Sequence, residues 1–204
     1  VEKSDIGGIC LNWGCIPSKA LIRNAEIINL LGRADEFGIE LTGFNYDFGK
    51  AIDRSRKVVK KLTKGVEFLL KKNNVDCFQD SAVLEDARTV NLVSTNEKLV
   101  GENIILATGA RPRNIPGLDI DRKTVITSRE ALEFKDISDR IVIIGGGAVG
   151  VEFGYVYSQY GAQVTIVELE PRIVPTEDEE ISDYLQKSLE KYGIEFKTNT
   201  RFES

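Results

Sequence analysis

The sequence predicts an α/β fold that contains at least one dinucleotide-binding unit. An apolar run over 140–144 leads directly into Gly145-Gly-Gly147-Ala-Val-Gly150, and a second apolar run over 163–167 ends at Glu168. A strand, a glycine-rich turn, a helix and an acid-terminated second strand, in that order, are typical of a Rossmann-like βαβ unit. Helical periodicity and short strand patterns earlier in the chain indicate the same fold class.

Length and composition bound the possible functions. The 204 residues suit one or two domains, and a hydrophobic content of 42% is ordinary for a globular chain. The formal net charge of −5 does not favour a nucleic-acid surface, and no apolar run is long enough to span a bilayer. Three cysteines without a signal peptide indicate a reducing compartment, so we expect a cytoplasmic protein.

The two ends of the chain suggest an internal piece of a longer protein. The sequence contains no methionine, begins close to a motif and stops at Ser204. Val1-Glu2-Lys3 predicts the end of a strand, and an acid at that position of a βαβ unit binds a ribose hydroxyl. On sequence alone, a solvated terminal residue is the simpler interpretation of Glu2. We expect the preceding strand and phosphate loop of this unit to lie upstream of Val1.

Cys10 and Cys15, in the run Cys10-Leu-Asn-Trp-Gly-Cys15, are the main candidates for a reactive site. In an ideal helix, Cα atoms five residues apart are separated by roughly 8–9 Å, whereas a disulfide tolerates at most about 7 Å. The pair can therefore close only if the helix start is distorted, which Gly14 permits. Pro17 suits the first turn of the helix that follows, and the N-terminus of that helix would stabilise a thiolate.

Spacing alone leaves more than one interpretation of these cysteines open. Both thiols could be buried and inert. No zinc site can be built, because the chain has no histidine and Cys77 is the only other thiol; we therefore expect no metal. A structural disulfide is disfavoured without a secretory signal. A redox pair and a pair of inert thiols remain.

The stretch Gly7-Gly-Ile-Cys-Leu-Asn-Trp-Gly-Cys-Ile-Pro-Ser-Lys-Ala-Leu21 resembles the active-site signature of the FAD-dependent pyridine nucleotide–disulfide oxidoreductases. Within that family it is most similar to the members that oxidise dihydrolipoamide, and the resemblance extends through the whole chain. It implies that Cys10 exchanges disulfide with the substrate and that Cys15 faces the flavin. It also implies that Gly7 and Gly8 lie in the FAD site and that Glu2 binds the FAD adenosine.

Two helices are predicted in the first third of the chain. The first runs from Ser18 to about Leu31, because apolar residues recur at helical spacing. Lys19 in its first turn is by itself an ordinary solvated lysine, but the resemblance places it beside the flavin ring, often paired with a glutamate, and Glu152 is the expected partner. The second helix runs from Phe48 to about Asn73, and we interpret its basic face as solvated rather than as a surface for an acidic partner.

Short strands are predicted over 75–84, 89–94 and 98–106. Cys77 in the first strand is expected to be a buried apolar thiol, and by resemblance the backbone of Ala82 contacts adenine. The third strand leads into Ala107-Thr108-Gly109, where a glycine after a buried strand lets the backbone approach a ligand. The resemblance assigns Thr108 and Gly109 to FAD, whereas on sequence alone a simple strand-to-loop turn is equally acceptable.

The glycine fingerprint assigns a role to each of its residues. Gly145 makes the tight turn, Gly147 lets the backbone reach a pyrophosphate at the helix N-terminus, and Gly150 lets helix and strand pack closely. Glu168 can accept hydrogen bonds from both ribose hydroxyls of NAD but repels the 2′-phosphate of NADP. We therefore expect NAD rather than NADP.

Two capping boxes flank this unit. Thr127-Ser-Arg-Glu130 is expected to open a short helix, and Thr176-Glu-Asp-Glu179 a second helix to about Lys191. Ile181, Leu185 and Leu189 are predicted to form the inner face of the second helix. A further strand is expected from Ile194.

These patterns give an expected domain organisation and function. Residues 1–116 are expected to form an FAD domain that lacks its N-terminal βαβ unit, and residues 117–204 the first half of an NAD domain. By resemblance, dihydrolipoamide reduces the Cys10–Cys15 disulfide, and the electrons pass to FAD and then to NAD. The implied partners are a lipoyl domain of a 2-oxoacid dehydrogenase complex or of the glycine cleavage system and a second copy in a homodimer, with no nucleic acid and no membrane.

Two other functions remain open. A glutathione- or mercuric-reductase-like enzyme would prefer NADP, against which Glu168 argues, and Ile16-Pro-Ser-Lys19 differs from the Val-Pro-Lys-Lys of glutathione reductases. The chain could also act only as a nucleotide-binding fragment, because the family needs a His–Glu pair from a partner subunit and this sequence contains no histidine. We therefore expect residues 1–204 alone to bind FAD poorly and to be inactive.

Overall fold

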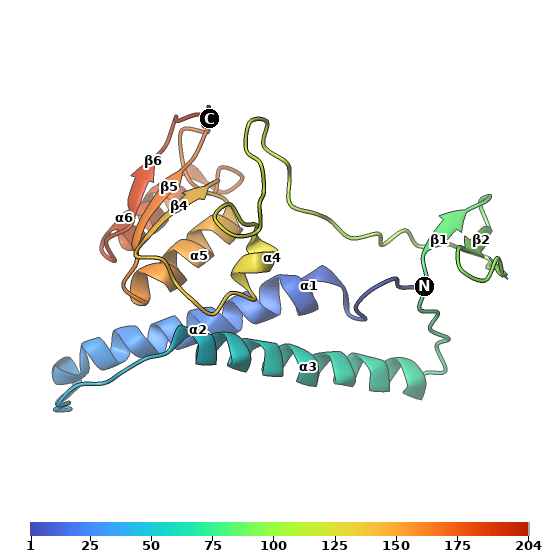
Figure 1. Ribbon diagram of the computed structural model, residues 1–204, viewed down its shortest axis with the longest axis horizontal. Helices are drawn as coiled ribbons and strands as arrows, with labels where there is room; N and C mark the ends of the chain where they lie inside the picture. Colours follow the sequence, from blue (N-terminus) through green and yellow to red (C-terminus); the bar gives the residue numbers. More distant parts are fainter. Residues whose placement is uncertain (204) are drawn as a thin grey trace.

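The computed structural model describes residues 1–203 and shows an α/β architecture with two separate three-stranded sheets (Figure 1). An antiparallel sheet lies at one end of the molecule, next to the N-terminus, and a parallel sheet lies towards the other end (Figure 1). Two long helices, α2 (Cys15–Gly32) and α3 (Phe48–Lys72), pack against each other along the long axis. The predicted fold class is confirmed.

The N-terminal helices follow the predicted apolar periodicity. They are α1 (Gly8–Trp13), α2, the short 3-10 helix η1 (Ala34–Phe37) and α3. The Asp47 carboxylate accepts a hydrogen bond from the Lys50 N–H (3.0 Å) and so satisfies a free donor at the start of α3. Helix α2 begins at Cys15 rather than at the predicted Ser18, which places the second cysteine of the motif in its first turn.

The antiparallel sheet contains three short strands in sequence order. They are β1 (Ala82–Leu84), β2 (Thr89–Leu92) and β3 (Lys98–Val100). The Asp86 carboxylate closes the turn between β1 and β2 by accepting hydrogen bonds from the N–H groups of Arg88 (2.7 Å) and Thr89 (2.9 Å). All three predicted strands are present, and each is shorter than predicted.

The segment that precedes Thr108 and Gly109 differs most from the prediction. Residues 104–108 form no strand, and Ile105 and Leu106 are 90% and 71% exposed. A strand needs a hydrogen-bonded neighbour, and none of the described residues pairs with this segment. Cys77 lies outside β1 and is exposed, so the prediction of a buried thiol is wrong.

The parallel sheet has the strand order β4–β5–β6. Its elements are β4 (Arg140–Ile144), α5 (Ala148–Gln159), β5 (Gln163–Val167), α6 (Glu179–Glu190) and β6 (Glu195–Lys197). Ile144 pairs with Val167, so β4 and β5 end together. The glycine-rich turn after β4 and Glu168 after β5 therefore lie at the same edge of the sheet, which confirms the predicted βαβ unit.

The two predicted capping boxes have different outcomes. At α4 (Ser128–Ala131), Thr127 and Glu130 form the predicted reciprocal cap. At α6, the N-cap is Asp178 instead of Thr176, and its carboxylate accepts a hydrogen bond from the Glu180 N–H (2.9 Å). Aspartate caps a helix at least as well as threonine, and Asp178 lies directly before the helix, so the second predicted box is wrong.

The inner face of α6 also differs from the prediction at one position. Ile181 is 59% exposed, whereas Ser182 and Leu189 are buried and Leu185 packs against the core. The Ser182 hydroxyl donates a hydrogen bond to the carbonyl oxygen of Val174 (3.4 Å). The buried position next to Ile181 is therefore held by a polar residue whose hydrogen bond is formed.

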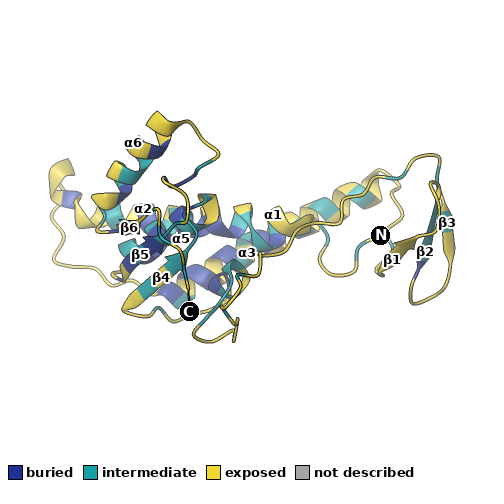
Figure 2. Ribbon diagram, turned by 90° about the horizontal axis from the view of Figure 1, so that it is seen from above, coloured by how far each residue is buried: buried dark blue, intermediate teal, exposed yellow. Residues whose placement is uncertain are grey.

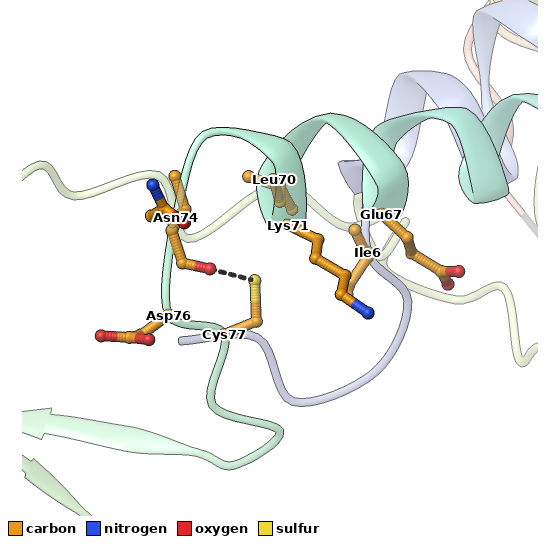
Figure 3. A pocket seen from close by; sticks show the side chains of 8 residues that line it. Ile6, Glu67, Leu70, Lys71, Asn74, Asp76 and Cys77 are labelled. Atoms are coloured by element: carbon orange, nitrogen blue, oxygen red, sulfur yellow. Dashed lines mark hydrogen bonds between the residues drawn. The ribbon is translucent and has the colours of Figure 1, made fainter.

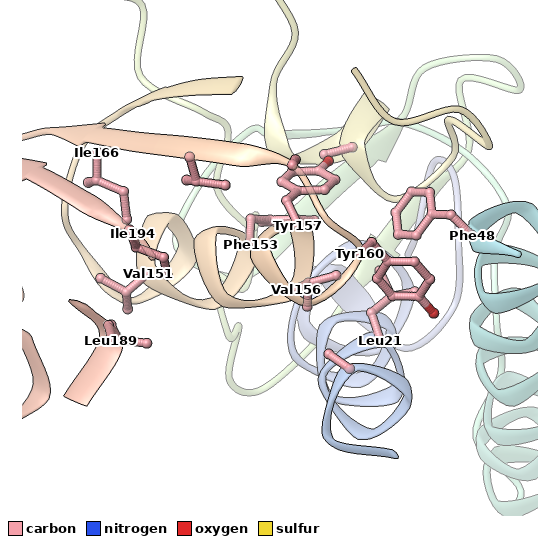
Figure 4. Close-up of a cluster of buried hydrophobic side chains, with 14 of the residues drawn as sticks. Leu21, Phe48, Val151, Phe153, Val156, Tyr157, Tyr160, Ile166, Leu189 and Ile194 are labelled. Carbon is pink, nitrogen blue, oxygen red and sulfur yellow. The ribbon is translucent and has the colours of Figure 1, made fainter. Parts of the chain in front are cut away.

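One hydrophobic core joins the helices of residues 1–116 to the parallel sheet (Figure 4). Leu21 of α2 and Ile52 of α3 are fully buried in it, together with Val156 of α5 and Ile166 of β5. Burial is concentrated around α2, α5 and β5, whereas Leu92 is the only buried strand residue of the antiparallel sheet (Figure 2). Because cores are close-packed, this contact fixes the position of α2 relative to α5.

Candidate functional site

Cys10 on α1 and Cys15 on α2 form a disulfide, which confirms the predicted pairing. Their Cα atoms are 4.7 Å apart, well below the roughly 8–9 Å expected for this spacing in an uninterrupted helix. The helix breaks at Gly14, where a Cβ atom would lie 3.2 Å from both the Cα of Cys10 and the carbonyl oxygen of Ile9. Glycine at this position therefore lets α1 approach the first turn of α2.

The position of Cys15 favours its thiolate form. Cys15 is the first residue of α2, and Pro17 lies in the same turn, as predicted. The start of a helix presents free N–H groups and the positive end of the helix dipole, both of which stabilise a thiolate. Both cysteines are exposed, so a substrate can reach the disulfide.

Asn12, which was not predicted as a site residue, lies between the two cysteines and is buried. Its Nδ2 donates to the carbonyl oxygens of Ile6 (2.9 Å) and Gly8 (3.0 Å), and its Oδ1 accepts from the Thr63 hydroxyl (3.2 Å). The side chain therefore holds the loop before α1 and ties α1 to α3. A polar residue inside a short cysteine motif is the sequence signal that could have identified it, because buried amides need partners on several sides.

Lys19 on α2 and Glu152 on α5 form an ion pair, which is the predicted partnership. Lys19 lies one turn after Cys15, and Glu152 lies on the helix that follows the glycine-rich turn. The pair therefore links the helix that carries the disulfide to the helix that carries the dinucleotide fingerprint. The Lys19 side chain is 61% exposed, so its ammonium group also remains accessible to a ligand.

Three of the predicted site glycines gather at the start of α1. Gly7, Gly8 and Gly109 all have positive φ angles, of 103°, 73° and 76°. A Cβ atom at Gly109 would lie 3.1 Å from the Cδ1 atom of Ile9, so the segment that contains Thr108 and Gly109 passes against α1. This proximity does not require residues 104–106 to continue the strand that was predicted over 98–106.

Glu2 forms an isolated parallel bridge with Gln79 beside the antiparallel sheet, near the N-terminus (Figure 1). The Glu2 N–H donates to the carbonyl oxygen of Phe78 (3.0 Å), and the Asp80 N–H donates to the carbonyl oxygen of Glu2 (3.1 Å). This parallel bridge shows that Glu2 is paired like a strand residue, as predicted. It brings Glu2 to the segment that leads into β1, whose first residue is Ala82.

A shallow surface depression of about 400 Å³ lies at the C-terminal end of α3 (Figure 3). It is lined by Ile6, the last turns of α3 and residues 74–77. The Cys77 thiol lies in it, 3.7 Å from the carbonyl oxygen of Val75. None of the predicted site residues lines this depression, so it is not part of the candidate site.

The glycine-rich turn has the geometry that its fingerprint predicts. A Cβ atom at Gly150 would lie only 2.0 Å from the carbonyl oxygen of Gly145, so α5 can approach β4 only with glycine there. Gly145 itself has a φ of 109°. At Gly147, by contrast, a Cβ atom would meet no atom within 4 Å, so the turn is open to a ligand at that residue.

Glu168 is held against this turn. Its Oε2 accepts a hydrogen bond from the Gly146 N–H (2.6 Å), and its Oε1 accepts one from the Glu170 N–H (2.8 Å). The Gly146 carbonyl oxygen in turn accepts from the Val174 N–H (2.8 Å). The carboxylate and the N-terminus of α5 therefore face the same region, as the spacing of the fingerprint predicts.

Residues 1–203 contain neither a metal-ligand cluster nor a membrane-spanning helix. Among these residues, no group of three or more His, Cys, Asp or Glu side chains is arranged to hold a metal ion. In the same part of the chain, no helix is both long enough and apolar enough to cross a bilayer.

The chain is similar to known sequences along its whole length. The family profile described as Pyridine nucleotide-disulphide oxidoreductase matches residues 1–204. The dihydrolipoyl dehydrogenase of Chlorobaculum parvum is 48% identical over 197 residues, covering 95% of this chain and 42% of the relative. That of Bacillus subtilis is 41% identical over 212 residues, covering 98% of this chain and 45% of the relative. The chain thus spans less than half the length of these relatives.

Solved structures share the fold. The Cu(II) complex of the HOCl-induced flavoprotein disulfide reductase RclA from Escherichia coli matches with a TM-score of 0.81 and 29% identity, over 99% of this chain and 43% of that chain. LpdA from Mycobacterium tuberculosis matches with a TM-score of 0.85 over 98% of this chain and 45% of that chain. Its identity of 23% limits the second comparison to the fold.

Proposed function

Because this chain belongs to the pyridine nucleotide-disulphide oxidoreductases, we propose that the complete protein oxidises dihydrolipoamide to lipoamide, with FAD as bound flavin and NAD as electron acceptor. The observation that carries the proposal is the exposed Cys10–Cys15 disulfide, whose second cysteine begins a helix. The dihydrolipoyl dehydrogenases that are 41% and 48% identical to the chain support the choice of substrate.

The proposed oxidation proceeds by thiol–disulfide exchange at Cys10. One thiolate of dihydrolipoamide attacks the Cys10 sulfur, a mixed disulfide forms, and Cys15 leaves as a thiolate. The second substrate thiolate attacks the substrate sulfur of the mixed disulfide, so lipoamide closes its S–S bond and Cys10 leaves as a thiolate. Two electrons have then moved to the cysteine pair, and the substrate has lost two protons. The start of α2 stabilises the Cys15 thiolate.

Bound FAD would supply the two-electron acceptor for the reduced pair, and the exposed groups around α1 fit such a ligand. A Cβ atom at Gly8 would meet no atom within 4 Å, and Lys19 presents an exposed ammonium group beside Glu152. The Glu2 carboxylate lies beside a strand bridge, where it suits a ribose hydroxyl. The residues proposed to hold FAD are Glu2, Gly7, Gly8, Lys19, Ala82, Thr108, Gly109 and Glu152.

The NAD site is proposed at the glycine-rich turn, with Gly145, Gly147, Gly150 and Glu168. The open surface at Gly147 and the N-terminus of α5 suit a pyrophosphate. The Glu168 carboxylate suits two ribose hydroxyls and repels a 2′-phosphate, which favours NAD over NADP. We accordingly assign residues 1–116 to an FAD-binding unit and residues 117–204 to an NAD-binding unit.

We propose partners and a location on the same basis. The substrate would be carried by a lipoyl domain of a 2-oxoacid dehydrogenase complex or of the glycine cleavage system, and the complete protein would act as a homodimer. A cytoplasmic location is consistent with the free, exposed Cys77 thiol, because such thiols persist in reducing compartments.

A substrate comparison on the complete purified protein tests this function. Three reactions are followed by nicotinamide absorbance: dihydrolipoamide with NAD, oxidised glutathione with NADPH, and Hg(II) with NADPH. We expect turnover only with the first pair, abolished by Cys10→Ser and by Cys15→Ser and retained by Cys77→Ser. Preferred turnover of glutathione or Hg(II) would assign the protein to another branch of the family, and no turnover with any pair would leave a nucleotide-binding role.

A further inference from the structure

Trp13, the last residue of α1, lies between the two cysteines and contacts two cationic side chains. The Cζ atom of Arg56 lies 4.3 Å from the centroid of the Trp13 ring, and that of Arg129 lies 4.0 Å from it. The indole Nε1 donates a hydrogen bond to the Asp5 carboxylate (2.9 Å). Arg56 belongs to α3 and Arg129 to α4, so this one ring joins α1 to two helices that are distant in sequence.

Arg56 is itself fixed in place. Its Nη1 donates to the carbonyl oxygen of Asn12 (2.7 Å), the residue before Trp13. Burial lowers the pKa of Arg56, while the carboxylates of Glu133 and Asp5 act in the opposite direction. A guanidinium that has lost part of its water interacts more strongly with an aromatic face than a fully solvated one does.

The contacts of Trp13 are made at the end of α1, directly before the break that brings the two cysteines together. Helix α1 must end at Trp13 and the chain must break at Gly14 for the Cα atoms of Cys10 and Cys15 to lie 4.7 Å apart. Trp13 lies one turn after Cys10, on the same side of α1. A side chain anchored there from α3 and α4 restricts how far α1 can swing away from α2.

We propose that Trp13, held by Arg56 and Arg129, is a positioning residue that keeps Cys10 within disulfide-forming reach of Cys15 when the pair is reduced. The inference deepens the proposed function, on which it rests for the role of the pair. Its consequence is a high effective concentration of one thiol at the other, since restricting two groups to a reactive geometry favours ring closure. Arg129 adds a link between α1, which carries Cys10, and the part of the chain that contains the glycine-rich turn.

The quantity to measure is the equilibrium between the reduced pair with oxidised glutathione and the disulfide with two reduced glutathiones. In this reaction one S–S bond breaks and one forms, and two hydrogens pass from the cysteines to glutathione. The complete protein is equilibrated in glutathione buffers, quenched by alkylation and analysed by mass spectrometry at Cys10 and Cys15. Because neither dihydrolipoamide nor NAD is used, the result does not depend on whether the proposed substrate is correct.

Trp13→Leu removes the aromatic face, and we expect the equilibrium constant for disulfide formation to fall about tenfold, as the loss of a partly desolvated cation–π contact predicts. Trp13→Phe keeps an aromatic face and should restore the constant to within about threefold of the parent. Arg56→Gln should lower it as well. Lys64→Gln on the same helix α3 removes the same charge from an exposed side chain and should leave it unchanged.

Two results overturn the proposal. The first is a Trp13→Leu protein that unfolds at a lower temperature but keeps the parental equilibrium constant, since Trp13 would then serve only the fold. The second is an Arg56→Gln constant equal to that of Lys64→Gln. The arginine comparison decides the question even if Trp13→Leu does not fold.

Discussion

Lys19 of α2 forms an ion pair with Glu152 of α5 and so joins the helix that begins at Cys15 to the helix that follows the glycine-rich turn. The two side chains are 61% and 26% exposed. Ion pairs with this degree of exposure contribute about 0–1 kcal/mol to stability. The contribution of this pair is therefore the orientation of the Lys19 ammonium group one turn from Cys15, rather than stability.

The first prediction separates these two contributions. Lys19→Met and Glu152→Gln should each change the free energy of unfolding by less than about 1 kcal/mol and lower kcat for dihydrolipoamide-dependent NAD reduction at least about tenfold, because the ammonium group loses its place or its partner. The double variant should be no worse than the poorer single variant. The matched control is Lys50→Met, which removes an exposed pair with Asp47 at 3.7 Å and should leave kcat unchanged. Additive losses in the double variant would show that the two residues act independently.

A second prediction concerns two glycines of the same turn. Gly150→Ala places a methyl group 2.0 Å from the Gly145 carbonyl oxygen, and forced overpacking of this kind costs about 1–3 kcal/mol. Gly147→Ala meets no atom within 4 Å, so it should lower the unfolding temperature much less than Gly150→Ala does, by no more than the loss of a glycine N-cap, and it should raise the KM for NAD by blocking its approach. Thermal unfolding and steady-state kinetics of both variants check this. A parental KM for NAD in Gly147→Ala would show that the pyrophosphate does not bind at this part of the turn.

The third prediction concerns the choice of nicotinamide cofactor. Replacement of Glu168 by Ser removes the carboxylate that repels a 2′-phosphate, so the ratio of kcat/KM for NADH to that for NADPH should fall by about tenfold or more. The variant also loses the hydrogen bond from the Gly146 N–H at 2.6 Å, so some loss of activity with NADH is expected. An unmodified protein that already prefers NADPH would contradict the role of Glu168.

The fourth prediction is a dependence of stability on pH above neutrality. Burial raises the pKa of Tyr157 to about 12, from an ordinary value of 10.0. Between these values the unfolded chain loses the phenolic proton while the folded chain retains it, so stability falls as the pH rises from about 10 to about 12. Between pH 9 and pH 11 this amounts to about 1.4 kcal/mol.

Urea unfolding at these two pH values checks this effect. Tyr157→Phe has no proton to lose and should show a fall in stability that is smaller than the parent's by about that amount. Tyr184→Phe, at a side chain that is 77% exposed, should retain the full parental pH dependence. Equal pH dependence in the parent and in Tyr157→Phe would show that Tyr157 ionises alike in both states.

The sequence was most informative where a local pattern has one physical solution. The run from Gly145 to Gly150 between an apolar strand and a helix requires a turn in which a Cβ atom at residue 150 cannot fit, and the structure contains that turn. The Cys10–Cys15 pair and the Lys19–Glu152 pair were also predicted, and both are formed. Their proposed ligands remain proposals.

The prediction was wrong where two residues could fill the same role, or where an element needs a partner that is distant in the sequence. Ile105 and Leu106 form an apolar run typical of a strand, but a strand exists only beside a hydrogen-bonded neighbour, which local pattern does not reveal. Thr176 and Asp178 both suit an N-cap, and the local pattern does not decide between them; in the structure Asp178 caps α6. The contacts of Trp13 with Arg56 and Arg129 follow no sequence period and were visible only in three dimensions.

In the proposed reaction, Cys10 and Cys15 take two electrons from dihydrolipoamide and give them up, through FAD, to NAD. The most direct measurement incubates the complete protein with dihydrolipoamide alone, alkylates it and maps each cysteine by mass spectrometry, then repeats the experiment after addition of excess NAD. We predict that dihydrolipoamide makes Cys10 and Cys15 fully alkylatable, that NAD restores their disulfide, and that the free Cys77 is alkylated throughout. A Cys10–Cys15 disulfide that dihydrolipoamide leaves intact, or a reduced pair that NAD does not reoxidise, would contradict the account.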